Sequence, residues 1–407
     1  MNRVKLLPDH VANQIAAGEV VERPASVVKE LVENALDADA KKITVEIQAG
    51  GRSLVRVTDD GYGMNRDDAL LSLERHATSK IRRAEDLAAI HTMGFRGEAL
   101  PSIASVSRFT LTTRGRDETS PEGTQIVVNG GKIIEVKAAG SATGTSVEVR
   151  SIFFNLPARR KFLRAEETES AHVQHYLTLA ALAHPEVAFT FVKDTRIVWQ
   201  LPAQKSAERF AGLRERLRAL LGDVKLLQVD FTASLSDGAT EVIDPTEIFD
   251  AAATGGSAVE ATPSAIYIWG FVGAPGVSRG TRDDQHVFVN RRPVENRGIN
   301  FALLEGYHNA LMKGRYPVCC LFLEINPAAV DVNIHPAKRE VKFHREFEIR
   351  KHFAEAVRQA LLSFHSASTV KSPSEPGQAA PSEQPGAQPQ FFRLGPVETA
   401  SPESKSG

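Results

Sequence analysis

One predicted helix carries most of the side chains that are suited to chemistry. From Pro24 to Asp39 apolar residues recur at helical spacing, and each residue advances about 100° around a helix. The carboxylates Glu30, Glu33 and Asp37 therefore fall within an arc of roughly 100° opposite the apolar face. Asn34 lies in the same stripe. Such a stripe could place a general base beside oxygen ligands for a hard cation, although polar stripes of this kind are more often solvated faces.

A second candidate element is an acidic residue at the end of a predicted hairpin. Alternating apolar residues predict two strands, residues 43 to 47 and 54 to 58, joined at a glycine turn. Asp59 follows directly, together with Gly61 and Gly63. A carboxylate there can accept a hydrogen bond from an exocyclic amine such as that of adenine, while glycines let backbone come close to a ligand. By itself the Asp-x-Gly-x-Gly pattern is more often a simple turn.

Two further segments contain glycines in positions that suit phosphate. Residues 94 to 100 predict a flexible loop that leads into an apolar helix, and backbone amides at such a place favour an anion. Gly144 precedes the hydroxyl residue Thr145 where another strand begins. The sequence contains no G-x-x-x-x-G-K-[ST] motif, so the more familiar phosphate loop is not supported.

These four segments, in this order, resemble the GHKL ATPases, the superfamily that includes DNA gyrase, a heat-shock chaperone, sensor histidine kinases and MutL. Longer strings resemble the MutL family of DNA mismatch-repair proteins in particular, over about residues 1 to 364. They are Asn13 to Pro24, Lys29 to Asn34, Arg75 to Lys80, Pro157 to Leu163 and Val332 to Lys338. The resemblance implies an α+β fold, in which an ATP-binding GHKL (Bergerat) α/β sandwich precedes an α/β transducer domain similar to the second domain of ribosomal protein S5.

The resemblance also implies roles for individual residues. Glu30 matches the general base that activates water, and Asn34 matches the Mg²⁺ ligand. Asp59 matches the residue that binds adenine, with Thr145 beside it. Lys338 matches a lysine that reaches from the second domain to the terminal phosphate and takes part in catalysis.

The implied cofactors are ATP and Mg²⁺, and further residues are expected to contact the nucleotide. They belong to the acidic helix, the glycine loop after the hairpin, and two segments that match a flexible lid over the phosphates. These residues are Asp37, Gly63, Thr78, Ser79, Lys80, Gly94, Phe95, Arg96, Gly97, Glu98, Ala99 and Leu100.

Length and composition indicate how the chain is divided. A chain of 407 residues exceeds one ordinary domain. A boundary near Pro202 to Ser206 would give an ATPase domain over residues 1–205 and a transducer domain over 206–365. Small and acidic residues at about 232–264 predict a surface insertion in the second domain. Residues 366–407 are rich in Pro, Ser, Glu, Gln and Gly and are expected to form a disordered linker or tail.

Charge gives no general attraction to nucleic acid, because the formal net charge is −1. Contact with DNA therefore needs a local basic patch. Arg297 matches an arginine implicated in DNA binding in the family, and the neighbouring Arg291, Arg292 and Lys313 could contact phosphates. Another basic cluster, Arg159 to Lys161, is typical of a solvated helix start, and its role is left open.

The cysteines and several histidines are expected to be structural. Cys319 and Cys320 are adjacent within an apolar strand, which would point them to opposite faces of the sheet. His286 lies in a pattern superficially like the metal motif of the MutL endonuclease region, but it precedes a predicted strand and turn. His76 and His335 are likewise interpreted as structural.

The resemblance implies several partners: MutS, single- and double-stranded DNA bound without sequence preference, a downstream nuclease or helicase, and a second copy of the chain when ATP binds. Gln388 to Phe392 resembles a peptide that binds a sliding clamp, although such short patterns often arise by chance. No membrane partner is expected, since no run of about 18 apolar residues occurs and the N-terminus lacks a secretory signal. A bacterial cytoplasmic, nucleoid-associated location is the default expectation.

Members of the MutL family carry a C-terminal dimerisation domain after a linker, and this sequence ends within linker-like material, so no endonuclease site is expected in it. ATP and Mg²⁺ are expected to order the lid and bring two N-terminal domains together around DNA, after which hydrolysis resets them. A scaffold gated by nucleotide, with hydrolysis too slow to matter, would need the same pocket. Another GHKL branch, such as a type II topoisomerase subunit, is a more distant alternative because its other motifs are missing.

Overall fold

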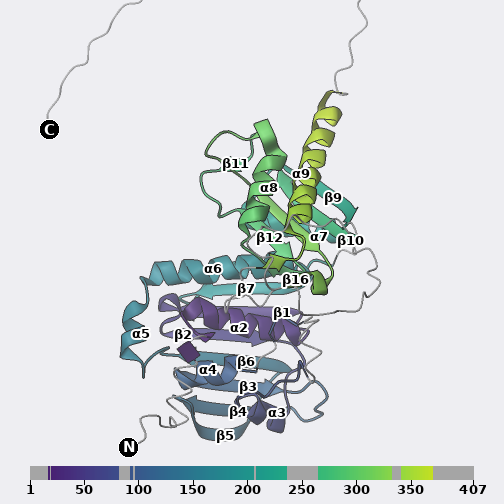
Figure 1. The fold of residues 1–407 in the computed structure, drawn as a ribbon. Coiled ribbons are helices and arrows are strands. Elements are labelled where there is room, and N and C mark those ends of the chain that lie inside the picture. Colours follow the sequence, from purple (N-terminus) through teal and green to yellow (C-terminus); the bar gives the residue numbers. More distant parts are fainter. Residues whose placement is uncertain are drawn as a thin grey trace, which may run out of the picture. The chain divides into compact units, whose positions relative to one another are not determined.

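The computed structural model describes residues 17–18, 20–81, 92–94, 97–205, 208–235, 265–331 and 341–369, which form helices and two large sheets (Figure 1). The predicted mixed α+β class is confirmed. Some sequence predictions fall outside the described residues. These are the predictions for Phe95, Arg96, His335, Lys338 and the segment Gln388 to Phe392.

The first sheet has eight strands in the order β5-β4-β3-β6-β2-β1-β7-β8. Neighbouring strands are antiparallel, except that β1 and β7 run parallel. The strands are β1 (Lys42–Gln48), β2 (Leu54–Asp59), β3 (Arg108–Arg114), β4 (Glu122–Asn129), β5 (Lys132–Gly140), β6 (Gly144–Arg150), β7 (Ala188–Lys193) and β8 (Arg196–Leu201).

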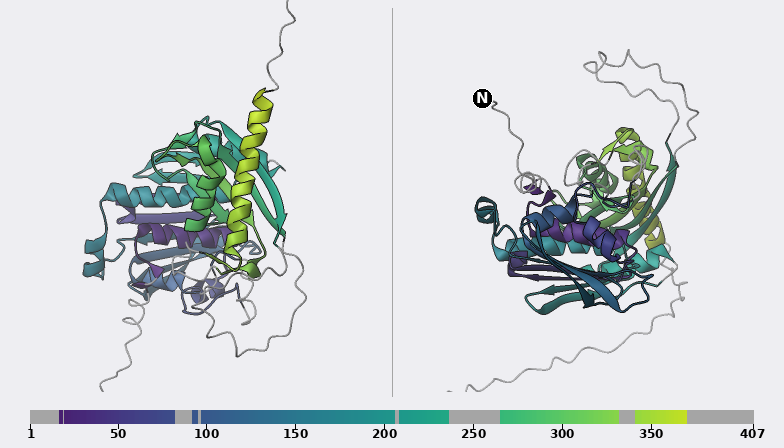
Figure 2. Two further views of the ribbon diagram at one scale, coloured as in Figure 1. Left: turned by 45° about the horizontal axis from the view of Figure 1, so that its top comes forward. Right: turned by 90° about the horizontal axis from the view of Figure 1, so that it is seen from below.

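Helices cover one face of this sheet, as both views of Figure 2 show. They are α2 (Pro24–Asp37), α4 (Ala99–Ser105) and α6 (Glu166–Ala183). Pro24 takes the first position of α2, where its fixed φ suits a helix start and its missing N–H leaves no bond unmade. Glu33 is only 4 % exposed, so the solvated-face alternative is wrong for this carboxylate.

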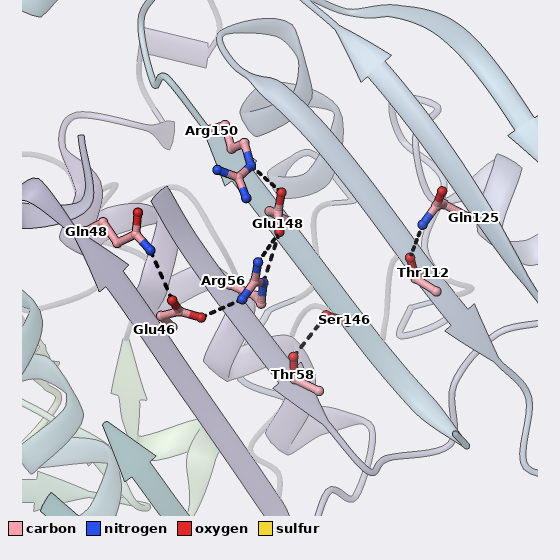
Figure 3. Close-up of polar contacts among 9 residues, drawn as sticks. All are labelled: Glu46, Gln48, Arg56, Thr58, Thr112, Gln125, Ser146, Glu148 and Arg150. Atoms are coloured by element: carbon pink, nitrogen blue, oxygen red, sulfur yellow. Dashed lines mark hydrogen bonds and ion pairs between the residues drawn. The ribbon is translucent and has the colours of Figure 1, made fainter. Parts of the chain in front are cut away.

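The other face of the sheet carries polar side chains (Figure 3). Arg56 on β2 lies between Glu46 on β1 and Glu148 on β6, and an N–O distance of 2.5 Å joins it to each carboxylate. Glu148 also accepts from Arg150. Because these groups are partly exposed, each pair contributes only about 0–1 kcal/mol to stability. Their alternation with buried residues explains which face of the sheet packs against the helices.

The second sheet has five strands in the order β13-β12-β15-β10-β9. The strands are β9 (Leu226–Ser234), β10 (Ala265–Gly273), β12 (Gln285–Val289), β13 (Arg292–Pro293) and β15 (Cys319–Glu324). Its neighbouring helices are α7 (Arg209–Leu221), α8 (Arg297–Tyr307) and α9 (Glu346–Thr369). The remaining elements are η1 (Ala49–Gly51), α3 (Arg66–Leu71), α5 (Pro157–Phe162), β11 (Ser278–Arg279), η3 (His308–Ala310), β14 (Tyr316–Pro317), η4 (Pro327–Ala329), β16 (Val330–Asp331) and β17 (Lys342–Phe343).

Both faces of this second sheet are buried. Residues of α8 and α9 pack with one face, while residues of α7 and the end of α6 pack with the other. The predicted placement of the cysteines is confirmed, since Cys319 belongs to the first of these clusters and Cys320 to the second. Burial raises the pKa of the Cys319 thiol to about 12, so the thiol is protonated at neutral pH.

Two expected boundaries change in the structure. Strand β9 continues to Ser234, which pairs with Ala265, so the first residues of the expected insertion at 232–264 are strand instead. Small residues are tolerated there because β9 is an edge strand. Helix α9 continues to Thr369, past the expected start of the tail at residue 366. Residues 236–264 and 370–407 lie outside the described part of the chain.

The described residues up to Ser366 belong to one compact unit. Among the helices that the structure describes, none combines the length and the apolar character that crossing a lipid bilayer requires.

Candidate active site

A cavity of about 1440 Å³ lies among α2, the ends of β2 and β6, and the segments at residues 76–80, 92–94 and 97–100. It is larger than the roughly 300–1,000 Å³ of most small-molecule sites. Every predicted catalytic, nucleotide or metal residue of the described chain lines it. These residues are Glu30, Asn34, Asp37, Asp59, Gly63, Thr78, Ser79, Lys80, Gly94, Gly97, Glu98, Ala99, Leu100 and Thr145.

Asp59 forms one end of the cavity, where β2 stops. It lies opposite Thr145 on the neighbouring strand β6, as the sequence analysis expected. The Gly61 N–H donates to Asp59 Oδ1 at 2.9 Å. Burial raises the pKa of Asp59 to about 6, although hydrogen bonds from the Gly61 and Thr145 backbone oppose the shift. Asp59 is therefore largely ionised at neutral pH and can accept hydrogen bonds. A ligand N–H could donate one of them.

The glycines beside Asp59 are required by the packing of the chain itself. A Cβ on Gly63, whose φ is +66°, would lie 1.9 Å from Arg114 O, and a Cβ on Gly61 would lie 2.7 Å from Ala38 O. From the sequence, these glycines were expected to allow close approach of a ligand. The structure gives a different reason, because backbone oxygens already occupy the space that a side chain would need.

Thr113 on β3 is a polar residue of this region that the sequence analysis missed. Its hydroxyl accepts from Met64 N at 3.0 Å and lies 3.0 Å from the hydroxyl of Thr145. It thereby ties the glycine loop to β6. Strand alternation could have identified it, because Thr113 has the same parity as the buried Phe109 and Leu111, whereas Thr112 has the opposite parity.

Oxygen atoms of α2 converge on a cation at the other end of the cavity. Lys80 Nζ lies 2.9 Å from Asn34 Oδ1 and 2.5 Å from Asp37 Oδ2. An amide oxygen and a carboxylate are ligands that Mg²⁺ prefers, so the donor set around this ammonium fits the predicted metal. The Asp37 side chain is only 7 % exposed, so the solvated alternative is wrong for it as well.

Asp37 also holds the segment 92–94 against α2. Met93 N donates to Asp37 Oδ1 at 2.8 Å, and Gly94 N donates to Asp37 Oδ2 at 3.1 Å. Two main-chain donors and one ammonium thus share a single buried carboxylate. Gly94 of the predicted lid is therefore held by Asp37, a helix residue that the family resemblance assigned to nucleotide binding.

Glu30 lines the cavity one helical turn before Asn34, with Tyr176 of α6 nearby. Burial raises the pKa of Tyr176 well above its ordinary value, and the negative charges of Glu33, Glu30 and Asp37 add to the shift. Three carboxylates therefore lie on the helix side of the cavity, where the cations Lys80 and Arg292 accompany them. Tyr176 was not predicted, because α6 gave no motif.

The two parts of the predicted lid lie next to each other. Gly97 has a φ of +65°, and a Cβ there would lie 2.3 Å from Ala77 O. His76 Nδ1 is 3.8 Å from Glu98 Oε1, and the His76 side chain is exposed. Both segments line the cavity.

The arginines of the second sheet do not form one exposed patch. Arg297 begins α8 and is exposed, as is Lys313. Arg291 is exposed but pairs with Glu186, with an N–O distance of 2.5 Å. Arg292 is only 9 % exposed and donates to Thr92 O at 2.5 Å, so its expected contact with DNA phosphate is wrong. A buried guanidinium that already has a main-chain acceptor cannot reach a duplex.

The expected structural role of His286 agrees with its position. The residue is buried on β12, and burial together with neighbouring His175 lowers its pKa to about 4. The imidazole is therefore neutral at physiological pH. Basic residues 159–161 lie on the short helix α5, of which no residue is buried.

Two family profiles match the chain. Residues 22–143 match the histidine kinase-, DNA gyrase B- and HSP90-like ATPase family, and residues 249–362 match the C-terminal domain of the DNA mismatch repair protein family. The solved structure of an Aquifex aeolicus MutL ATPase domain complexed with ADP matches with a TM-score of 0.51 at 28 % identity, over 83 % of this chain and 98 % of that chain. The N-terminal domain of a DNA repair protein matches with a TM-score of 0.70 at 22 % identity, over 88 % and 99 % of the two chains, which shows the fold alone.

Curated relatives agree with these profiles. The DNA mismatch repair protein MutL of Opitutus terrae is 48 % identical over 362 residues, which are 89 % of this chain and 52 % of that protein. MutL of Symbiobacterium thermophilum is 49 % identical over 364 residues, 89 % of this chain and 51 % of that protein. The chain spans about half the length of the curated relatives it matches. By sequence and by fold, the chain belongs to the MutL family of DNA mismatch-repair proteins and contains a GHKL ATPase domain.

Proposed function

We propose that this chain binds ATP together with Mg²⁺ in the cavity and hydrolyses it. The observation that carries the proposal is the convergence of Glu30, Asn34 and Asp59, from two separate elements, on one cavity. The ADP complex of the Aquifex aeolicus MutL ATPase domain supports an adenine nucleotide as the ligand.

Each end of the cavity has a task that its chemistry suits. Asp59 accepts a hydrogen bond from the exocyclic amine of adenine, and Thr145 lies beside it. Asn34 supplies an amide oxygen to Mg²⁺, which would neutralise charge on the phosphates. Glu30 accepts a proton from the attacking water. Lys80 and the backbone near Gly94 and Gly97 lie where the phosphates would be enclosed.

In mismatch repair we infer a matchmaker role, in which nucleotide binding links recognition of a mismatch by MutS to a downstream nuclease or helicase. Closure of the lid would bring two N-terminal domains together around DNA, and hydrolysis would separate them. The exposed Arg297 and Lys313 are the described residues of the predicted patch that remain available to phosphates. The division into an ATPase domain over 1–205 and a transducer over 206–365 is supported by the distribution of the strands. Strands β1 to β8 form the first sheet, and the strands of the second sheet begin with β9.

A direct test combines binding and turnover. Calorimetric titration with ATP, in Mg²⁺ and in a chelator, should show binding that Mg²⁺ strengthens, and phosphate release should be measured with and without single-stranded DNA. Absence of nucleotide binding would contradict the whole proposal. Magnesium-dependent binding without phosphate release would instead identify a scaffold that nucleotide gates without hydrolysis.

The pH dependence of nucleotide affinity should follow Asp59. Its pKa is raised to about 6, so the carboxylate loses its charge as the pH falls through 6 and becomes a poorer acceptor. Affinity for ADP should therefore fall by up to about tenfold per pH unit below this value. Calorimetry between pH 5 and pH 8 measures this change. Asp59→Asn should bind weakly at every pH and lack the step, whereas an unchanged wild-type affinity from pH 8 to pH 5 would exclude Asp59 as the adenine acceptor.

The raised pKa of Asp59 also makes the stability of the fold depend on pH. Because the folded-state pKa lies above the ordinary value of 3.8, the protonated form is favoured on folding. The contribution of Asp59 to stability is therefore fully present below pH 4 and is lost as the pH rises through 6. Part of the folding free energy is thus given up at neutral pH to keep an ionised acceptor in the cavity.

A further inference from the structure

A tight hairpin turn in the second sheet leads into the buried Arg292. Strands β12 and β13 are joined by the two residues Asn290 and Arg291, whose φ values are +48° and +66°, and Val289 pairs with Arg292. Positive φ at both positions is typical of the tight type I′ turn. The Asn290 side chain donates to Ile325 O at 2.9 Å and accepts from Ile325 N at 3.0 Å. The turn is therefore fixed to the end of β15, and the direction in which Arg292 leaves it is fixed too.

Arg292 brings a positive charge from this hairpin to the carboxylates of α2. It is 9 % exposed, and burial lowers its pKa while the charges of Glu33 and Asp37 oppose the shift. A guanidinium loses much solvation energy on burial, which nearby carboxylates and a carbonyl acceptor offset. The acceptor that the structure gives it is Thr92 O, at 2.5 Å.

From Thr92 a continuous series of hydrogen bonds leads to the predicted metal ligand. The Thr92 hydroxyl donates to Gly94 O at 2.9 Å, and the next two backbone amides, those of Met93 and Gly94, both donate to Asp37. Asp37 binds Lys80, which also contacts Asn34 Oδ1.

We propose that Arg292 is a positioning residue through which the second sheet sets the geometry of the metal end of the nucleotide site. By holding Thr92, it keeps the Met93 and Gly94 amides on Asp37 and so fixes where Asp37 and Lys80 lie relative to Asn34. A displacement of the hairpin releases this segment and lowers affinity for the metal-bound nucleotide, while the adenine end is unaffected. The effect on nucleotide rests on the proposed function, but the effect on the segment 92–94 does not.

Arg291 provides a matched control within the same turn. It carries the same charge one residue earlier, yet it pairs with Glu186, whose carboxylate is not among the residues that line the cavity. Arg291→Met and Arg292→Met therefore remove the same group from the same hairpin, and only the second removes the hydrogen bond to Thr92.

The first experiment measures hydrogen exchange at the Met93 and Gly94 amides in the nucleotide-free chain. Arg292→Met should accelerate exchange at both amides by about tenfold or more, since local opening is no longer resisted at Thr92. Arg291→Met should leave both at the wild-type rate. Unchanged exchange in folded Arg292→Met would overturn the proposal whether or not the chain binds nucleotide. Should Arg292→Met fail to fold, Arg292→Lys is measured in its place, and its single donor group should still give faster exchange than the wild type.

The second experiment measures the affinity for ATP by calorimetry with Mg²⁺ and in a chelator. Arg292→Met should weaken binding in Mg²⁺ by about tenfold, within the range usual for coupled sites, and leave binding in the chelator unchanged. In the double variant, the effects of Arg292→Met and Asp37→Asn on ATP affinity should be non-additive, because both substitutions break the same hydrogen-bond network. Equal loss in both conditions, or strict additivity, would assign Arg292 to general packing and overturn the proposal. If no variant and no wild type binds ATP, the proposed function fails, while the exchange result still decides the role of Arg292.

Discussion

Replacement of Glu30 by alanine should abolish most ATP turnover while nucleotide binding persists. General acid–base catalysis contributes about 10²- to 10⁴-fold to a rate, and we expect kcat to fall within that range. Binding should change little because Asp59, Asn34 and Lys80, at either end of the cavity, remain in place. Steady-state phosphate release gives kcat, and calorimetry gives the dissociation constant of ATP.

Glu22 supplies the control for this substitution, because it also lines the cavity but lies at its exposed rim. Glu22→Gln removes a cavity carboxylate without removing the proposed base, so its kcat should stay near that of the wild type. Wild-type turnover by Glu30→Ala would refute the assignment of the base. An equal loss in both variants would indicate that the total charge of the cavity matters more than proton transfer.

The second large effect is expected for Asn34→Ala, which should remove the part of ATP affinity that depends on Mg²⁺. The amide oxygen of Asn34 already contacts a cation, at 2.9 Å from Lys80 Nζ, and alanine leaves that position without its ligand. We expect the affinity in Mg²⁺ to fall by at least about tenfold, or 1.4 kcal/mol. Affinity in a chelator should stay at the wild-type value, and a magnesium titration at fixed ATP measures the difference.

Asn34→Asp tests whether an oxygen ligand at this position is sufficient for magnesium-dependent binding. It replaces the amide by a carboxylate of the same shape, which keeps an oxygen ligand for a hard cation, so part of the magnesium dependence should return. An alanine variant with the magnesium dependence of the wild type would show that the cation is bound elsewhere. Loss of affinity in the chelator as well would indicate a damaged cavity.

Local patterns predicted those parts of the site that short segments form alone. Apolar spacing and Pro24 are properties of a single helix, and they located α2 with Glu30 and Asn34 on its cavity side. Strand alternation and a glycine turn located the hairpin that ends at Asp59. The position of Thr145 beside Asp59 required more, because it depends on the order of strands in the sheet, which the family resemblance supplied and the alternation pattern does not contain.

Features that depend on distant partners were missed or misjudged. Arg292 was predicted to contact phosphate, since nothing in its neighbourhood along the chain shows that Thr92, Glu33 and Asp37 will surround it. The burial of Glu33 has the same origin, because α6 packs on a helix face that its own spacing marks as polar, and Arg292 of the second sheet lies near it. Thr113 was missed although its spacing after Phe109 and Leu111 places it on the buried face, because strand alternation does not reveal its contacts with Met64 and Thr145.

The parallel pairing of β1 with β7 has a consequence for synthesis of the chain. Residues 49 to 187 separate the two strands, yet β7 forms a whole edge of β1. At the roughly 5–20 residues per second of translation, β1 waits about 7 to 28 seconds on the ribosome before that partner emerges. Until β7 emerges, β1 is an edge strand of the nascent sheet, because β2 covers only its other side, and that open backbone edge can pair with other chains.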